Sequence, residues 1–124
     1  MPKQATQKLV MLRKTDEFSS VFSFRKRLPS SFLVTHYSPN ALMQPRIGFV
    51  VAKKVAKLAV DRNYMRRVLR ELCKQELYVL ASVDVVIQVQ KPFKNSDFLT
   101  IKQELAGLFA KIHKRLTAEQ LTNA

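Results

Sequence analysis

The basic residues of segment 53–74 recur three and four positions apart from Arg62 onward, which is the spacing of one helix face. With a helical turn of about 100° per residue, the polar side chains fall within an arc of about 140°. The apolar side chains fall between about 200° and 340°, so the two arcs do not overlap. The sequence therefore predicts an amphipathic helix over residues 61–81. Its polar arc holds Arg62, Asn63, Arg66, Arg67, Arg70 and Lys74, and its apolar arc holds Tyr64, Met65, Val68, Leu69 and Leu72.

The charge of this segment is almost entirely of one sign. Eight basic residues stand against two acids, and Lys53, Lys54 and Lys57 extend the positive charge ahead of the helix. A helix face that is only solvated normally mixes both signs, so we favour binding of a polyanion over simple solvation. Four of the five charged residues of the polar arc are arginines, which suit two-pronged contacts with phosphate.

The composition limits the class of protein and its partners. The chain has 124 residues, a formal net charge of +13 and 47% hydrophobic residues, which predict one folded domain over 1–124, with residues 1–12 as a flexible basic tail. Such an excess of positive charge attracts nucleic acid or anionic membrane. We expect no membrane partner, because no apolar run approaches the roughly 18 residues of a spanning helix and the start lacks a secretory signal. A single cysteine fits a reducing compartment, so we expect cytoplasmic localisation.

The periodicity along the chain predicts an α+β domain with the element order αβββαβα. A short helix is expected to open at Thr15, with that residue as its N-cap, and a final helix is expected to follow a cap within residues 95–97. The central helix over 61–81 lies between the third and fourth strands. The four strands are expected at residues 23–28, 31–37, 46–52 and 84–89, the last of them apolar on both faces and therefore buried.

No catalytic centre is apparent in the sequence. There is no glycine-rich phosphate loop, no nucleophile elbow and no Cys/His spacing typical of zinc. We interpret His36 and His113 as ordinary residues, and Cys73, at the border of the two helical arcs, as packed and not reactive. Nine acids leave few candidates for a two-metal nuclease cluster, so we expect the protein alone to be non-catalytic.

Two aromatic features could serve either a core or a nucleic acid. Phe18 and Phe22 lie one helical turn apart, and they fit a packed core and a stacking surface for unpaired bases equally well. In the strand over 31–37, Leu33, Thr35 and Tyr37 share one face, and Tyr37 is a second stacking candidate.

Several motifs together are similar to those of the bacterial ribonuclease P protein subunit. They are R-I-G-F-V-V-A-K-K over 46–54, then R-N-x-x-R-R-x-x-R-E over 62–71. The E-F-S-S-V-F segment over 17–22 and D-V-V-I over 84–87, followed by Lys91 and Pro92, extend the match to roughly residues 12–116. Tyr64 departs from the family, because many members have a further basic residue at its position.

The resemblance implies a function, partners and a cofactor. Members form a holoenzyme in which a large RNA subunit with bound Mg²⁺ removes the 5′ leader of precursor tRNA, while the protein, one per RNA, binds both RNAs. It also implies a mixed four-stranded sheet with a left-handed β-α-β crossover. Residues assigned to the catalytic RNA are Lys53, Lys54, Lys57, Arg62, Asn63, Arg66, Arg67 and Arg70. Residues assigned to the leader are Phe18, Phe22, Thr35, Tyr37 and Lys91.

Two other functions remain open from the residues alone. A structural RNA-binding protein, such as a ribosomal protein, fits the composition equally well. A DNA-binding helix module fits less well, because the basic helix is expected within a sheet domain and lacks a helix-turn-helix partner.

Overall fold

The computed structural model describes residues 8–123, and the side chains of residues 8–118. Residues 1–7, which make up most of the expected basic tail, lie outside the described residues. Three α-helices and five strands form an α+β domain, in agreement with the predicted fold class. The elements are β1 (Val10–Met11), α1 (Thr15–Ser23), β2 (Lys26–Pro29), β3 (Leu33–Pro39), β4 (Arg46–Val50), α2 (Ala59–Glu76), a 3₁₀ turn (Leu77–Val79), β5 (Val83–Val89), a second 3₁₀ turn (Asn95–Asp97) and α3 (Phe98–Asn123).

The strands form one mixed sheet in the order β1-β4-β5-β3-β2. Strand β5 runs parallel to β4 and antiparallel to β3, and β3 pairs antiparallel with β2. Helix α2 connects the neighbouring parallel strands β4 and β5, as a parallel pair requires a crossover. Strand β5 is buried along nearly all of its length, as its apolar sequence predicts.

The fifth strand is a correction to the sequence-based expectation. Val10 and Met11 pair in parallel with Arg46 and Ile47 at the edge of the sheet, although residues 1–12 were expected to form a flexible tail. The following residue, Leu12, is buried and donates its backbone N–H to the carbonyl of Ile47. A two-residue strand has no periodicity of its own, so only its pairing with a distant strand reveals it.

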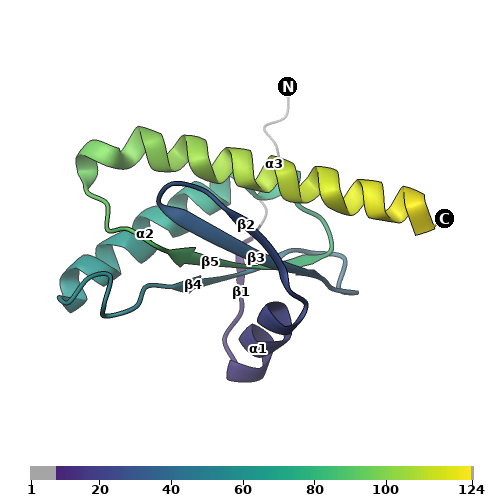
Figure 1. The fold of residues 1–124 in the computed structure, drawn as a ribbon, viewed down its shortest axis with the longest axis horizontal. Coiled ribbons are helices and arrows are strands. Elements are labelled where there is room, and N and C mark those ends of the chain that lie inside the picture. The colour runs from purple at the N-terminus through teal and green to yellow at the C-terminus, as the bar shows by residue number, and fades with distance from the viewer. Residues whose placement is uncertain (1–7, 124) are drawn as a thin grey trace.

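The helices cover opposite faces of the sheet (Figure 1). One face packs against α2 and α3 in the main core, to which β3 contributes Leu33 and Tyr37 and β5 contributes Val85 and Ile87. The opposite face packs against α1 in a smaller cluster. The members of that cluster are Leu12, Val21 and Val86, with Phe18 and Val50 packed against them.

Helix α2 has the two faces that its sequence predicts. Met65, Val68, Leu69 and Leu72 are buried in the main core, and Cys73 is buried with them. Its bounds differ from the expected 61–81, because the α-helix begins at Ala59 and gives way to the 3₁₀ turn after Glu76.

The start of α1 also differs from the expectation. Lys14, and not Thr15, is the N-cap residue. The Glu17 carboxylate supplies the capping contacts, because its Oε1 accepts the backbone N–H groups of Arg13 at 2.8 Å and Lys14 at 3.0 Å.

Candidate nucleic-acid interface

One positive surface is formed by the exposed side of α2 and the loop that leads into it. We call this the α2 surface; its members are Lys53, Lys54, Lys57, Arg62, Asn63, Arg66, Arg67 and Arg70. All are exposed apart from Arg62 and Arg66, which are half-buried. The structure therefore brings together all eight residues that the sequence assigned to one RNA partner.

Arg62 holds the lysine-bearing loop in place. Its Nη1 donates to the carbonyl oxygens of Ala56 at 2.9 Å and Lys57 at 2.8 Å. The loop therefore closes onto the first turn of α2 through a charged donor, which is stronger than a neutral one. Arg62 fixes the backbone that carries Lys53, Lys54 and Lys57, in addition to its predicted contact with RNA.

Short-range contacts orient other side chains of the α2 surface. Arg66 donates to Oδ1 of Asn63 at 3.1 Å, and the Arg67 guanidinium lies 5.8 Å from the centre of the Tyr64 ring. Guanidinium groups held in this way lose less conformational freedom when they bind phosphate.

A second surface lies on the other side of the sheet, between α1 and strands β3, β4 and β5. Phe18 lies directly over Gly48, since a Cβ built on Gly48 would come within 2.6 Å of the Phe18 ring. A glycine is required here because the helix side chain approaches the strand backbone so closely. Phe18 is thus mainly a packing residue that seats α1 on the sheet.

Phe22 is the exposed member of the aromatic pair. Its side chain is 39% exposed, and its ring meets the His36 ring edge-on at a centroid distance of 4.6 Å. His36 Nε2 hydrogen-bonds Oε1 of Gln88 at 3.1 Å. Burial lowers the pKa of His36, and the nearby Arg27 charge acts in the same direction. A neutral imidazole beside an open aromatic ring provides flat, uncharged area that can contact bases. We call Phe22, His36 and Gln88 the α1 surface.

A charged network fixes α1 against the sheet. Arg46 on β4 donates from Nε and Nη2 to the two carboxylate oxygens of Asp84, at 2.9 and 2.8 Å. Its Nη1 donates to Oε2 of Glu17 on α1 at 2.9 Å. The contact with Asp84 raises the pKa of Arg46, and the backbone N–H groups at the start of α1 lower the pKa of Glu17. The position of α1 over the sheet therefore depends on Arg46.

Besides Phe18, three further residues assigned to the leader do not belong to the α1 surface. Thr35 and Tyr37 are fully buried on the sheet face that α2 and α3 cover, so their assignment as contact residues is wrong. Thr35 Oγ1 donates to the carbonyl of Leu28, while the Tyr37 hydroxyl has no hydrogen-bond partner among the described residues. Lys91 is exposed beyond β5, with its Nζ 4.8 Å from the centre of the Phe32 ring, and no contact joins it to Phe22.

Sequence reasoning missed His36 and Gln88. His36 was interpreted as an ordinary residue, and it shares the strand face opposite to Thr35 and Tyr37 with Val34 and Ser38. It lies beside Arg27 on β2 and Val86 on β5 in the register of the sheet. The signal was the alternation of β3, which assigns His36 and Tyr37 to opposite faces.

The described residues were also searched for a metal site, a membrane-spanning helix and a reactive thiol. No cluster of three or more His, Cys, Asp or Glu side chains within the described part of the chain could hold a metal ion. No helix in residues 8–123 combines the length and the apolar character needed to cross a bilayer. Cys73 is buried, which raises the pKa of its thiol, so the packed interpretation of this residue is confirmed.

The fold and its surfaces define a class of protein. An α+β domain with a net charge of +13 presents arginines and lysines on α2 and an aromatic surface beside α1. Such an arrangement is typical of a protein that binds nucleic acid by phosphate contacts and base stacking.

Comparison with known proteins identifies the family. The Ribonuclease P family profile matches residues 6–113. The ribonuclease P protein component of Azoarcus sp. (strain BH72) is 42% identical over 101 residues, which cover 82% of this chain and 84% of that protein. The component of Chromobacterium violaceum is 43% identical over 101 residues, with the same coverage of 82% and 84%. This chain belongs to the ribonuclease P protein family.

Solved structures support the same assignment. The RNase P protein from Thermotoga maritima has a TM-score of 0.74 and 27% identity, covering 82% of this chain and 96% of that chain. The RNase P protein from Staphylococcus aureus has a TM-score of 0.73 and 25% identity, covering 86% of this chain and 97% of that chain. The resemblance found in the sequence is confirmed. The chain is an RNA-binding protein component of an endoribonuclease that works with an RNA subunit in tRNA 5′ processing.

Proposed function

We propose that this protein binds the ribonuclease P RNA through the α2 surface and the 5′ leader of precursor tRNA through the α1 surface. One protein binds one RNA in the cytoplasm, and the RNA subunit carries both the Mg²⁺ and the cleavage chemistry. The described residues hold no group of three or more His, Cys, Asp or Glu side chains that could bind a metal ion. The arrangement that carries the proposal is the placement of the two surfaces on opposite faces of one sheet.

The chemistry of the α2 surface favours a structured RNA backbone. Its charges lie on a helix and on a loop that Arg62 fixes, so they meet phosphates with little loss of freedom. The chemistry of the α1 surface favours unpaired nucleotides, because Phe22 and His36 offer ring faces and edges in place of a row of cations.

Reconstitution tests the proposal as a whole. The chain is mixed with ribonuclease P RNA, and cleavage of precursor tRNA is followed at low Mg²⁺. We expect the protein to raise the cleavage rate above that of RNA alone. No increase at any protein concentration would refute the proposed function.

Two matched pairs of variants test the division between the surfaces. Phe22→Ala is compared with Phe98→Ala, because both residues are 39% exposed and Phe98 begins α3 on the other side of the sheet. We expect only Phe22→Ala to weaken discrimination between precursor and mature tRNA, by about 5- to 150-fold if one stacked base is lost.

The second pair compares changes of equal charge. Arg67→Ala with Arg70→Ala removes two cations from the α2 surface, whereas Lys102→Ala with Lys111→Ala removes two exposed cations from α3. We expect only the arginine variant to weaken binding of the ribonuclease P RNA and to reduce its salt slope by about 2. Equal effects of the two double variants would contradict the assignment of the α2 surface.

A further inference from the structure

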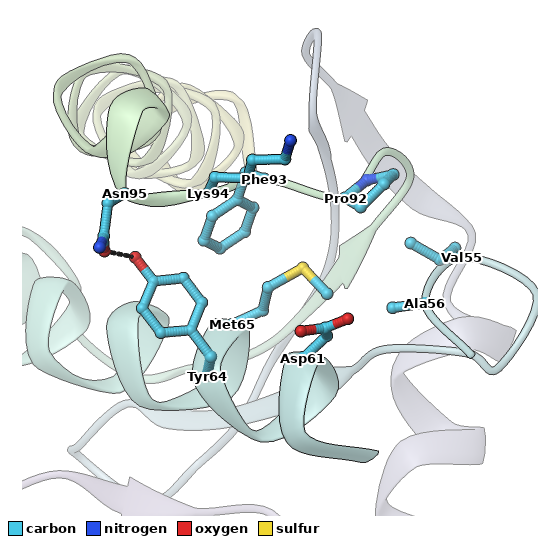
Figure 2. Close-up of a pocket in the computed structure, with 9 residues that line it drawn as sticks. All are labelled: Val55, Ala56, Asp61, Tyr64, Met65, Pro92, Phe93, Lys94 and Asn95. Atoms are coloured by element: carbon cyan, nitrogen blue, oxygen red, sulfur yellow. Dashed lines mark hydrogen bonds between the residues drawn. The ribbon is translucent and has the colours of Figure 1, made fainter. Parts of the chain in front are cut away.

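A pocket of about 420 Å³ opens between the first turns of α2 and the connection from β5 to α3. Figure 2 shows the loop before α2 on one side and Phe93 and Asn95 on the other. The pocket also lies beside the α2 surface, because Val55 and Ala56 come from the loop that carries Lys53, Lys54 and Lys57.

Two aromatic rings form one wall of the pocket. The rings of Tyr64 and Phe93 lie 6.3 Å apart between centroids with an interplanar angle of 58°. The Tyr64 hydroxyl donates to Oδ1 of Asn95, and Arg67 lies over the Tyr64 ring, so this ring is held from two directions. A fixed aromatic wall in a cavity of this size fits a flat ring such as a nucleobase.

Asp61 supplies the one carboxylate that lines the pocket, beside the polar side chains of Lys94 and Asn95. Its side chain is exposed, and its carboxylate has no hydrogen-bond partner among the described residues. Figure 2 shows the carboxylate between Met65 and Ala56. A lone carboxylate repels phosphate, so it does not serve the backbone contacts of the α2 surface. Two acceptor oxygens side by side are instead suited to two neighbouring N–H donors.

We propose that this pocket binds one unpaired guanine base of the ribonuclease P RNA, an inference that rests on the proposed binding of that RNA by the α2 surface. Guanine presents an imino N–H and an amino group side by side on one edge, and the Asp61 carboxylate accepts both. Adenine and cytosine present a ring nitrogen acceptor beside their amino group. This acceptor would repel the second carboxylate oxygen of Asp61. The base stacks on the Tyr64 ring, the nearly buried Phe93 ring borders it at an angle, and its flanking phosphates lie toward Lys53, Lys54 and Lys57.

Trinucleotides of equal charge provide the test. UGU, UIU, UAU and UCU, where I is inosine, are titrated into the ¹⁵N-labelled chain, and chemical shifts give the affinity and the site. Each oligonucleotide contributes the same phosphate attraction, so a difference in affinity reports the base. We expect UGU to bind about tenfold more tightly than UAU, the value typical of a bidentate base contact. UIU, which lacks the amino group, falls between them. The shifts are expected at Tyr64, Phe93 and Asn95.

Two variants of equal charge separate base recognition from general attraction. Asp61→Asn and Glu71→Gln each remove one negative charge from α2, and Glu71 lies outside the pocket, where it pairs with Lys74. We expect Asp61→Asn to reduce the preference for UGU over UAU to below twofold, whereas Glu71→Gln retains it. Circular dichroism verifies that both variants keep the helical content of the parent.

Three results would overturn the inference. They are equal affinities of the parent for UGU and UAU, a guanine preference that survives Asp61→Asn, and shifts confined to Phe22 and His36. Binding to the full ribonuclease P RNA is measured in parallel. If the chain binds that RNA without preferring UGU, the guanine pocket alone is wrong. If it does not bind that RNA at all, the proposed function is wrong.

Discussion

Replacing Arg46 should loosen the attachment of α1 to the sheet. It should thereby weaken leader binding by the α1 surface, although Arg46 is not a member of that surface. The Arg46 guanidinium is the common partner of Asp84 on β5 and Glu17 on α1. In Arg46→Met the apolar stem remains, but three charge-assisted hydrogen bonds are lost. Asp84, whose side chain is only 9% exposed, then keeps a single side-chain donor, Nδ2 of Asn40 at 2.7 Å. The penalty comes mainly from this buried carboxylate.

The expected loss of unfolding free energy follows from the solvent exposure of the Arg46, Asp84 and Glu17 side chains. Removing one partner of a fully buried ion pair costs about 3–5 kcal/mol, whereas an exposed pair contributes about 0–1 kcal/mol. Side-chain exposure of 21% for Arg46 and 9% for Asp84 places this pair nearer to the buried limit. We therefore expect Arg46→Met to lower the free energy of unfolding by about 2–3 kcal/mol, which is about 6–15 °C in Tm for a chain of this size. Arg46→Lys keeps the charge but not the two-pronged contact, so it should cost about 1 kcal/mol.

Urea unfolding measured by circular dichroism provides the assay, and the chain contains its own control. Lys74 pairs with Glu71 at 3.3 Å, but the two side chains are 43% and 61% exposed. Lys74→Met should therefore change the free energy of unfolding by less than about 0.5 kcal/mol. If Arg46→Met costs no more than Lys74→Met, the network does not hold α1 in place and the reasoning fails. A loss of stability with unchanged leader discrimination would refute only the link between Arg46 and the α1 surface.

Three further changes test other parts of the structure. Gly48→Ala places a Cβ within 2.6 Å of the Phe18 ring, so it should cost about 1–3 kcal/mol in urea unfolding, and adding Phe18→Leu should recover part of the loss. Tyr37→Phe removes a buried hydroxyl without a partner, so the free energy of unfolding should stay equal or rise by about 1 kcal/mol; a clear fall would show that the hydroxyl is satisfied. The pKa of His36 is lowered from its usual 6.5, so the unfolded state binds its proton more readily. Unfolding free energy should therefore be fully maintained above pH 6.5 and decline as the pH falls below it, and His36→Gln should flatten this dependence in urea titrations at each pH. An NMR titration that places His36 at or above its usual pKa would contradict this explanation.

The sequence predicted best what depends on local periodicity. The angular separation along α2 identified its buried residues, because one face of a helix follows from spacing alone. Met65, Leu69 and Leu72 are buried as expected, and the charged residues lie outside the core. The prediction that the arginines of α2 lie on one exposed face needed no knowledge of the sheet, because the spacing of the residues along the helix determines that face.

The leader assignment failed at Thr35 and Tyr37 because it depended on long-range packing. The alternation of β3 shows which residues share a face, but it does not show that the main core buries Thr35 and Tyr37 while His36 stays partly exposed. Which helix covers which face is set by the order of the strands and by the crossover through α2. The same reason explains the missed strand β1 and the pocket at Asp61, since each joins segments more than 25 residues apart.

The two proposed surfaces share one structural support, the strand β4. Its residues alternate, so that Arg46 and Gly48 face α1 while Ile47 faces the main core, and the chain then continues into the loop that carries Lys53 and Lys54. Strand β4 is bonded on both sides, to β1 and β5, and such internal strands are among the last parts of a domain to open. Neither surface can shift far without moving this strand. The protein would thus hold the leader at a fixed position relative to the catalytic RNA, and the binding energies of the two surfaces would add without a conformational change to link them.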